Sequence, residues 1–367
     1  MRVWYPRLSS AEEVARLREW VGEGIELFGG EPGPSDYEVL VDGWPNAERL
    51  EASSVLRSVI VPFTGVPPET LTLLRQRPRL SLHNIHHSGP ETAEMALALM
   101  FAVCKRIVPM DRLLRKGEWS PRWDDAQSLR LEGKRALVLG YGGIGRRIAK
   151  ACVALGMKVT AMRNRPELGA DAPVSVVSFQ NLAEALACAE VLHIALPLTP
   201  RTEGMIGERE LAALPKGTIL INVARAKIVD ERPLFEALAS GHLGGAGLDV
   251  WYRYPKPGER VSPSDYPFET LDNVVLSPHR GGSSTEVESH RFEHIAKLLR
   301  QAEQGEAMEN RIDRKWGIDQ AALTWPTNST SAFSATSLYA RIGSEGRLFS
   351  ANRRRGSLSC VLQISTA

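Results

Sequence analysis

The chain has 367 residues, of which 43% are hydrophobic and 24% are charged, and its net charge is +2 at pH 7. At roughly 150 residues per domain, this length predicts two domains. The near-balanced charge argues against a nucleic-acid-binding protein that works through bulk positive charge. The longest apolar run, Met95 to Cys104, has ten residues, about half the length of a membrane span, and no apolar stretch of signal-peptide length opens the chain. We therefore expect a cytoplasmic protein that binds neither nucleic acid nor membrane.

The first ninety residues alternate short apolar segments with helical patterns. Strand-like segments cover residues 2–5, 37–41, 58–62 and 80–83, and helical patterns cover residues 11–21 and 67–75. This alternation predicts a small parallel α/β domain. One long helix is then predicted over Glu91–Ile107, because the apolar residues from Met95 to Val103 keep a helical period and Pro90 stands near the first turn.

A second α/β series begins at Lys134. Strand-like runs cover residues 136–139, 158–162, 191–196, 218–223, 246–250 and 274–277, and helix-compatible sequence separates most of them. Several of these runs are too apolar for a half-exposed strand, which predicts a parallel sheet covered on both faces. A last helix is predicted over residues 286–304.

The carboxyl-terminal segment, residues 321–367, has a composition of its own. It contains five arginines, one acidic residue and fourteen serines and threonines. No apolar period is kept for long, so we expect this tail to be mostly disordered.

A glycine-rich loop stands between the strand-like run 136–139 and a helical pattern. It contains Gly140, Gly142, Gly143, Ile144 and Gly145, and the strand–loop–helix context is what gives such a motif its meaning. Gly140 permits a tight turn, Gly142 lets a pyrophosphate approach the backbone, and Gly145 allows close helix–strand packing. The helix N-terminus then offers unpaired N–H groups to phosphates. The loop predicts a dinucleotide site.

The residues after the next strand bear on which dinucleotide binds. An acidic residue here would accept hydrogen bonds from the adenosine ribose, but the chain has Arg163, Asn164 and Arg165. Two guanidinium groups suit a 2′-phosphate by charge and by geometry. We therefore expect NADP as the preferred cofactor, with NAD as a possible one.

Four segments together resemble the D-isomer-specific 2-hydroxyacid dehydrogenases: LEGKRALVLGYGGIG, HIALPLTPRTEGMIG, LPKGTILINVARAKIVDERPLFEAL and LSPHRGG. The resemblance implies an α/β fold of two lobes, in which a Rossmann-type cofactor domain is inserted into a flavodoxin-like substrate domain. Residues 1–90 and 286–320 would form the substrate domain, and residues 91–285 the NAD(P)-binding domain. It also implies a homodimer.

The resemblance assigns roles residue by residue. Arg225 matches the arginine that binds the carboxylate of a 2-oxoacid substrate, and His279 matches the acid/base histidine. Thr64 and Gly65 match the loop whose backbone N–H groups hold that carboxylate. The positions that border the cofactor in the family match Pro197, Thr202, Val223, Ala224, Asp249 and Gly282. No metal site is predicted, because the pair His86-His87 has no acidic or cysteine partner at a useful spacing.

The chain departs from the family where a glutamate normally follows the aspartate, because Tyr254 stands in its place. That carboxylate would orient the histidine and raise its pKa. A tyrosine can orient the ring through its hydroxyl but carries no charge at pH 7. We therefore include Tyr254 with the catalytic residues, leave its role open, and expect the pKa of His279 to be lower than in relatives with the glutamate.

The sequence thus favours an NAD(P)-dependent oxidoreductase that reduces a small 2-oxoacid by hydride transfer. Two alternatives stay open. One is a hydride transfer without proton transfer, of the formate dehydrogenase kind. The other is a non-catalytic binding protein that senses the dinucleotide.

Overall fold

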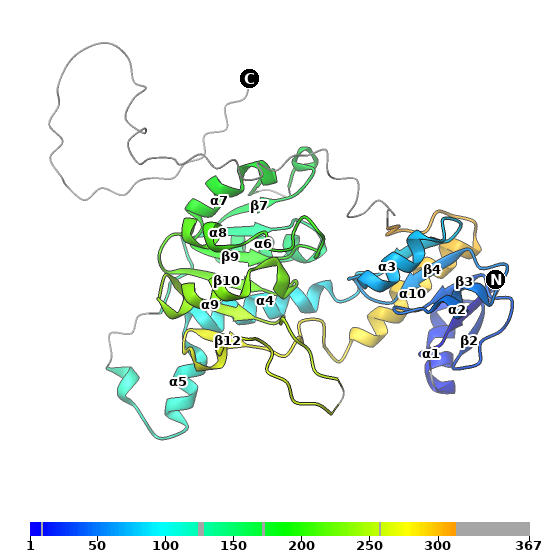
Figure 1. Cartoon of the computed structure of the whole chain (residues 1–367), viewed down its shortest axis with the longest axis horizontal. Helices are drawn as coiled ribbons and strands as arrows, with labels where there is room; N and C mark the ends of the chain where they lie inside the picture. Colours follow the sequence, from blue (N-terminus) through cyan, green and yellow to red (C-terminus); the bar gives the residue numbers. More distant parts are fainter. Residues whose placement is uncertain (9, 124–127, 171–172, 257, 313–367) are drawn as a thin grey trace, which may run out of the picture. The chain divides into compact units, whose positions relative to one another are not determined.

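The computed structural model describes residues 1–8, 10–123, 128–170, 173–256 and 258–312. Their strands form two parallel sheets, one of five strands and one of seven (Figure 1). The predicted tail, and the last eight residues predicted for the substrate domain, lie outside the described residues. Within the described part of the chain, no helix is both long enough and apolar enough to cross a membrane.

The first sheet has the strand order β2-β1-β3-β4-β5. Helices α1 and α10 contribute to a core on one face, and α2 and α3 contribute to a core on the other. A capping box between Ser10 and Glu13 fixes the start of α1. The bounds are β1 Arg2–Tyr5, α1 Ala11–Val21, β2 Glu26–Gly29, β3 Val39–Val41, α2 Ala47–Glu51, β4 Ser58–Val61, α3 Pro68–Arg75, β5 Ser81–Asn84 and α10 Val287–Glu303.

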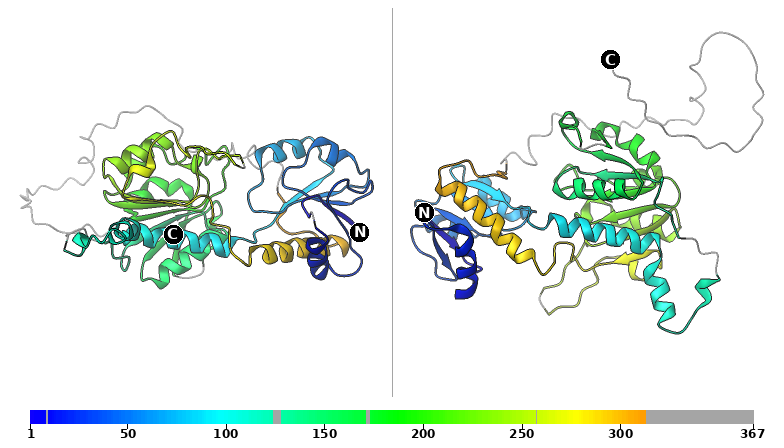
Figure 2. Two further views of the ribbon diagram at one scale, coloured as in Figure 1. Left: turned by 90° about the horizontal axis from the view of Figure 1, so that it is seen from below. Right: turned by 180° about the vertical axis from the view of Figure 1, so that it is seen from behind.

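The second sheet has the strand order β12-β11-β10-β9-β6-β7-β8, and helices cover both of its faces (Figure 2). Helices α4 and α6 contribute to the core on one face. The bounds are α4 Gly89–Cys104, β6 Arg135–Leu139, α6 Gly143–Ala154, β7 Lys158–Met162, β8 Val174–Val177, α7 Leu182–Cys188, β9 Val191–Ile194, α8 Glu208–Ala213, β10 Thr218–Asn222, α9 Glu231–Ala239, β11 Leu243–Leu248 and β12 Val274–Leu276.

The order of the second sheet reverses at β6. The chain runs outward from β6 to β8, returns to the other side of β6, and runs outward again from β9 to β12. Ligands of such sheets bind outside the carboxyl ends of the strands, at the point of reversal. The glycine-rich loop follows β6 and therefore lies at this point.

The prediction of one helix over Glu91–Ile107 was wrong at its end. Helix α4 stops at Cys104, and a separate helix, α5, covers Ile107–Leu114. The break lies at Arg106, whose φ of 52° is left-handed. Apolar periodicity does not reveal a single reversed residue, because the pattern continues across it. Strands β2 and β8 were not predicted.

Candidate active site

The glycine-rich loop has the geometry that a dinucleotide requires. Gly140 has a φ of 99°, and a Cβ at Gly145 would lie 1.8 Å from the carbonyl oxygen of Gly140, so neither position accepts a side chain. A Cβ at Gly142, in contrast, would meet no protein atom within 4 Å. Gly142 precedes α6, which begins at Gly143 and has no side-chain cap on its N–H groups. Open space beside uncapped N–H donors fits a pyrophosphate.

Arg163, the first of the two arginines after β7, lies beside this loop. The Arg163 guanidinium lies 6.0 Å from the centre of the Tyr141 ring, and its Nη1 is 3.4 Å from the carbonyl oxygen of Gly169. Asn164 and Arg165 are exposed. Neither arginine takes part in an ion pair among the described residues. Both charges are therefore open to an anionic group.

The loop after β9 is closed by Thr202. Its hydroxyl donates to the carbonyl oxygen of Pro197 at 2.6 Å and accepts from the amide of Thr199 at 2.8 Å. Thr202 is thus a structural residue of this loop, and the exposed Pro197 lies at the carboxyl edge of the sheet.

Arg225 follows β10 and is positioned by a residue that sequence reasoning missed. Asn222 accepts from the amide of Ala224 at 3.0 Å and donates to the carbonyl oxygen of Arg225 at 3.1 Å. Val223 and Ala224, which precede it, are buried. Burial lowers the pKa of the half-buried Arg225 guanidinium, and the Tyr254 hydroxyl partly opposes this shift. Because such a group is poorly hydrated, it gains more from a carboxylate partner than a surface arginine does.

The buried Asp249, after β11, fixes the loop that carries His279. Its Oδ1 accepts from the Ser277 hydroxyl at 2.5 Å and from the Arg280 amide at 2.8 Å, and its Oδ2 accepts from the Gly281 amide at 2.8 Å. His279 lies between these anchors with a left-handed φ of 58°. Ser277 was not among the predicted residues, and only its proximity to Asp249 in space reveals its role.

Tyr254 lies against His279, with ring centres 5.4 Å apart. The Tyr254 hydroxyl accepts from the Trp251 amide at 3.0 Å, so the oxygen that was expected to orient the histidine already has a backbone partner. Burial lowers the pKa of His279, the charge of Arg225 lowers it further, and Asp249 raises it in part. Burial raises the pKa of Tyr254, which keeps its hydroxyl neutral at pH 7.

The loop after β4, which was expected to hold the substrate carboxylate, approaches Arg225. A Cβ at Gly65 would lie 2.1 Å from Nη2 of Arg225, so only a glycine lets the loop approach the guanidinium so closely. The carbonyl oxygen of Thr64 accepts a hydrogen bond from Asn84. Gly282 packs on Ser88 at the start of α4, where a Cβ would lie 3.2 Å from the serine Cβ.

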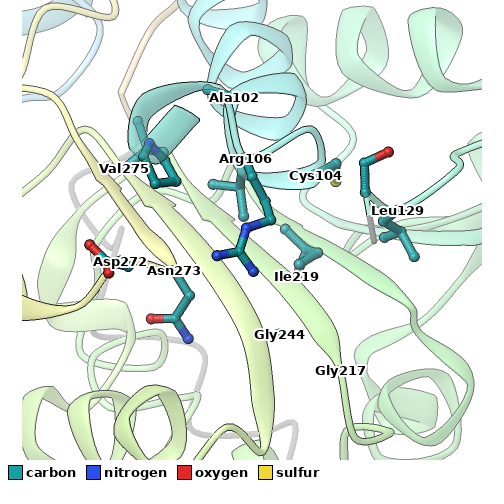
Figure 3. Close-up of a pocket in the computed structure, with 13 residues that line it drawn as sticks. Ala102, Cys104, Arg106, Leu129, Gly217, Ile219, Gly244, Asp272, Asn273 and Val275 are labelled. Carbon is teal, nitrogen blue, oxygen red and sulfur yellow. The ribbon is translucent and has the colours of Figure 1, made fainter. Parts of the chain in front are cut away.

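The predicted residues of the cofactor lobe therefore share one edge, because each follows the carboxyl end of its strand. At the opposite edge of the same sheet lies a pocket of about 320 Å³ near the end of α4. Arg106, Ile219, Gly244 and Asn273 line it (Figure 3). None of the predicted site residues does. The described residues contain no group of three histidines, cysteines or acids able to hold a metal.

Comparison with known proteins defines the class. Residues 97–281 match the family model described as D-isomer specific 2-hydroxyacid dehydrogenase, NAD binding domain. A glyoxylate reductase of Pyrococcus horikoshii is 33% identical over 315 residues, which are 84% of this chain and 85% of that protein. A glyoxylate reductase of Korarchaeum cryptofilum is 32% identical over 228 residues, 61% of this chain. This second alignment spans 66% of the relative, slightly less than two thirds of its length.

A solved structure supports the same family. A D-isomer specific 2-hydroxyacid dehydrogenase from Xanthobacter autotrophicus, in complex with NADPH and MES, superposes with a TM-score of 0.71 at 25% identity and covers 86% of this chain and 98% of its own. The chain belongs to the D-isomer specific 2-hydroxyacid dehydrogenase family. The resemblance and the fold class predicted from the sequence are thereby confirmed.

Proposed function

We propose that this protein is an NAD(P)-dependent 2-hydroxyacid dehydrogenase that reduces a small 2-oxoacid. The observation that carries the proposal is the convergence of Arg225, His279 and the glycine-rich loop on one edge of the sheet. The charge of Arg225 lowers the pKa of His279, which supports a common site for the two side chains.

The chain's own residues have separate roles. Arg225 binds the substrate carboxylate through its guanidinium, and the backbone of Thr64 and Gly65 holds the other side of that carboxylate. His279 donates the proton to the oxygen of the substrate carbonyl. Tyr254 packs against the histidine ring and keeps water from one of its faces. The nicotinamide cofactor supplies the hydride when it is bound.

We propose NADP as the preferred cofactor. Arg163 and Arg165 stand where a carboxylate would favour NAD, and both are free of ion pairs among the described residues. The double variant Arg163→Ser/Arg165→Ser is expected to raise the KM for NADPH by about tenfold or more and to leave the KM for NADH within about twofold. Equal losses with both cofactors would contradict the preference.

We further propose the domain division that the resemblance implies. Residues 1–90 and 286–320 form the substrate domain, and residues 91–285 form the cofactor domain. The separate cores of the two sheets support this division.

The decisive experiment measures oxidation of NADPH and NADH at 340 nm with a panel of 2-oxoacids. Turnover that is lost in His279→Asn is the expected result, because asparagine tolerates the left-handed backbone but cannot donate the proton. Turnover that survives in the variant would show that His279 is not the proton donor, because reduction of a 2-oxoacid always consumes a proton. Reduction of NADP+ or NAD+ by formate, measured at the same wavelength, would favour hydride transfer without proton transfer. Cofactor binding without any turnover would favour the dinucleotide-sensing protein.

We also propose that the protein forms a homodimer through the segment that begins with α5. Within the described residues α5 buries none of its side chains. The exposed apolar residues of this segment, with exposed fractions between 51% and 73%, are Ile107, Leu114, Trp119 and Trp123. Apolar surface of this kind marks an interface.

The dimer is tested by light scattering at micromolar concentration. The wild type is expected at twice the monomer mass and Leu114→Asp at the monomer mass. Val55→Asp is the matched control, because Val55 is 50% exposed on the other sheet's lobe. A monomeric wild type, or a dimeric Leu114→Asp, would contradict this interface.

A further inference from the structure

A pocket of about 250 Å³ lies at the carboxyl edge of the five-stranded sheet. Its residues come from the ends of different strands. Tyr5 is the last residue of β1, Trp44 follows β3, and Pro62 and Phe63 follow β4.

The position of this pocket in the topology favours a ligand. The order of the first sheet reverses between β1 and β3, because β2 lies on one side of β1 and the later strands lie on the other. Tyr5 and Trp44 end these two strands. The pocket thus occupies the switch point of the substrate lobe, where sheets of this order bind their ligands.

The wall of the pocket is aromatic. The rings of Trp44 and Phe63 lie 4.8 Å apart with an interplanar angle of 41°. Gly43 makes this packing possible, because a Cβ there would lie 2.4 Å from the Phe63 ring. The Arg7 guanidinium lies 4.7 Å from the centre of the Trp44 ring, which restricts the tryptophan side chain. A preformed aromatic face is suited to a planar apolar group.

The charges at the rim are balanced. Arg291 binds both carboxylate oxygens of Glu288 at 2.8 Å. Arg7 and Glu13 are the other two charged groups that line the pocket. Two cations and two carboxylates give no net charge to attract an acidic side chain.

The pocket adjoins the place where the substrate carboxylate is proposed to bind. Phe63 is two residues before Gly65, and a Cβ at Gly65 would lie 2.1 Å from the Arg225 guanidinium. Phe63 lines the pocket, so one short loop joins the aromatic wall to the backbone that is proposed to hold the substrate carboxylate.

We infer that this pocket holds the side chain of the 2-oxoacid and that the side chain is aromatic. The inference rests on the proposed function. Trp44 is then the residue that selects an arylpyruvate over glyoxylate, which has no side chain to place in the pocket.

The test compares kcat/KM for phenylpyruvate, glyoxylate and 2-oxoglutarate in the wild type, in Trp44→Ala and in Trp20→Ala. Trp44 is 50% exposed, so its truncation spares the core, and Trp20, 41% exposed on α1, is the matched control. We expect phenylpyruvate to be the best substrate of the wild type. In Trp44→Ala its kcat/KM falls by about 10–100-fold, while that of glyoxylate changes by less than about threefold. Trp20→Ala changes neither.

A wild type that turns over glyoxylate or 2-oxoglutarate better than phenylpyruvate would overturn the inference and leave the proposed function standing. An equal loss of kcat/KM for all three substrates in Trp44→Ala would also overturn the inference. If no substrate is turned over, the proposed function fails. Titration calorimetry with phenyllactate then tests whether the pocket binds an aromatic side chain. Binding that Trp44→Ala weakens at least about tenfold supports the pocket, and binding that is absent or unchanged overturns it.

Discussion

At the scale of single residues, Tyr254 places an uncharged aromatic ring where the family normally has a charged glutamate. Burial and the charge of Arg225 hold the pKa of His279 below its ordinary value of 6.5, and a neutral tyrosine does nothing to restore it. In the proposed reaction His279 donates the proton, so we expect kcat/KM for reduction to fall as pH rises through this lowered pKa.

Tyr254→Glu is therefore expected to move the pH profile of reduction upward by about one unit, because a carboxylate stabilises the imidazolium. The measurement is kcat/KM between pH 5 and 9. Tyr254→Phe is the control. It removes the acceptor of the Trp251 amide without adding charge, so it should leave the profile in place. A glutamate variant with the wild-type profile would show that Tyr254 does not govern the titration.

Asp249 is the residue on which the geometry of His279 depends. In Asp249→Asn an amide N–H₂ replaces the Oδ2 that accepts from Gly281, and two donors then face each other. We expect a loss of about 1–3 kcal/mol in the free energy of unfolding and a fall in kcat on the order of 100-fold.

Ser277→Ala is the matched control for Asp249→Asn, since it leaves both backbone N–H groups on the carboxylate. Urea unfolding and initial rates measure the two effects. The interpretation fails if the serine variant loses as much activity as the asparagine variant.

At the scale of elements, the loop between β6 and α6 contains one glycine that the fold requires, Gly145, and one that cofactor binding requires, Gly142. Gly145→Ala places a Cβ against the Gly140 carbonyl and is expected to lower the free energy of unfolding by about 1–3 kcal/mol.

Gly142→Ala adds a methyl group to open space. It should keep the wild-type melting temperature and weaken NADPH binding by about tenfold, because the methyl group displaces the pyrophosphate. Thermal melts with and without NADPH check both. A destabilised Gly142→Ala would contradict the assignment.

The sequence alone predicted the glycine-rich loop, because the spacing of its glycines between a strand and a helix is set by the backbone geometry of dinucleotide-binding turns. The end of α4 was not predictable, since the left-handed Arg106 leaves the apolar period intact. Strands β2 (ELFG) and β8 (VSVV) are four residues long and partly exposed, and apolar runs as short as theirs do not separate a strand from other structure by periodicity alone. The roles of Asn222, Ser277 and the Trp251 amide depend on contacts between segments far apart in the chain, and no local pattern contains that information.

At the scale of the whole molecule, two buried histidines link stability to pH. Burial lowers the pKa of His193 to about 4, and burial with the charges of Arg291, His294, His290 and His86 lowers that of His87 to about 4. Both are neutral when folded and take up protons on unfolding below their ordinary pKa of 6.5. Above pH 6.5 these two histidines therefore do not reduce the free energy of unfolding. That free energy decreases as pH falls from 6.5 toward 4, because the unfolded chain binds protons that the folded protein does not.

Each histidine contributes on the order of 3 kcal/mol to this loss. His193→Asn removes one titration, so the difference in unfolding free energy between pH 7 and pH 4.5 should shrink relative to the wild type. Cys152→Ala is the control. It alters the neighbour whose Sγ lies 3.8 Å from His193 Nε2, and it should cost the same at both pH values. Urea titrations at the two pH values measure this, and an unchanged difference in His193→Asn would refute the linkage.

The left-handed backbone of His279 has a consequence for how this chain can vary. Most L-residues avoid that conformation, asparagine and glycine adopt it readily, and valine and isoleucine scarcely do. A library randomised at position 279 and selected only for a folded protein should therefore be enriched in glycine and asparagine and depleted of β-branched residues. A lineage that abandoned catalysis would then drift toward a small set of replacements at this position, and that set could be recognised among its descendants without any assay.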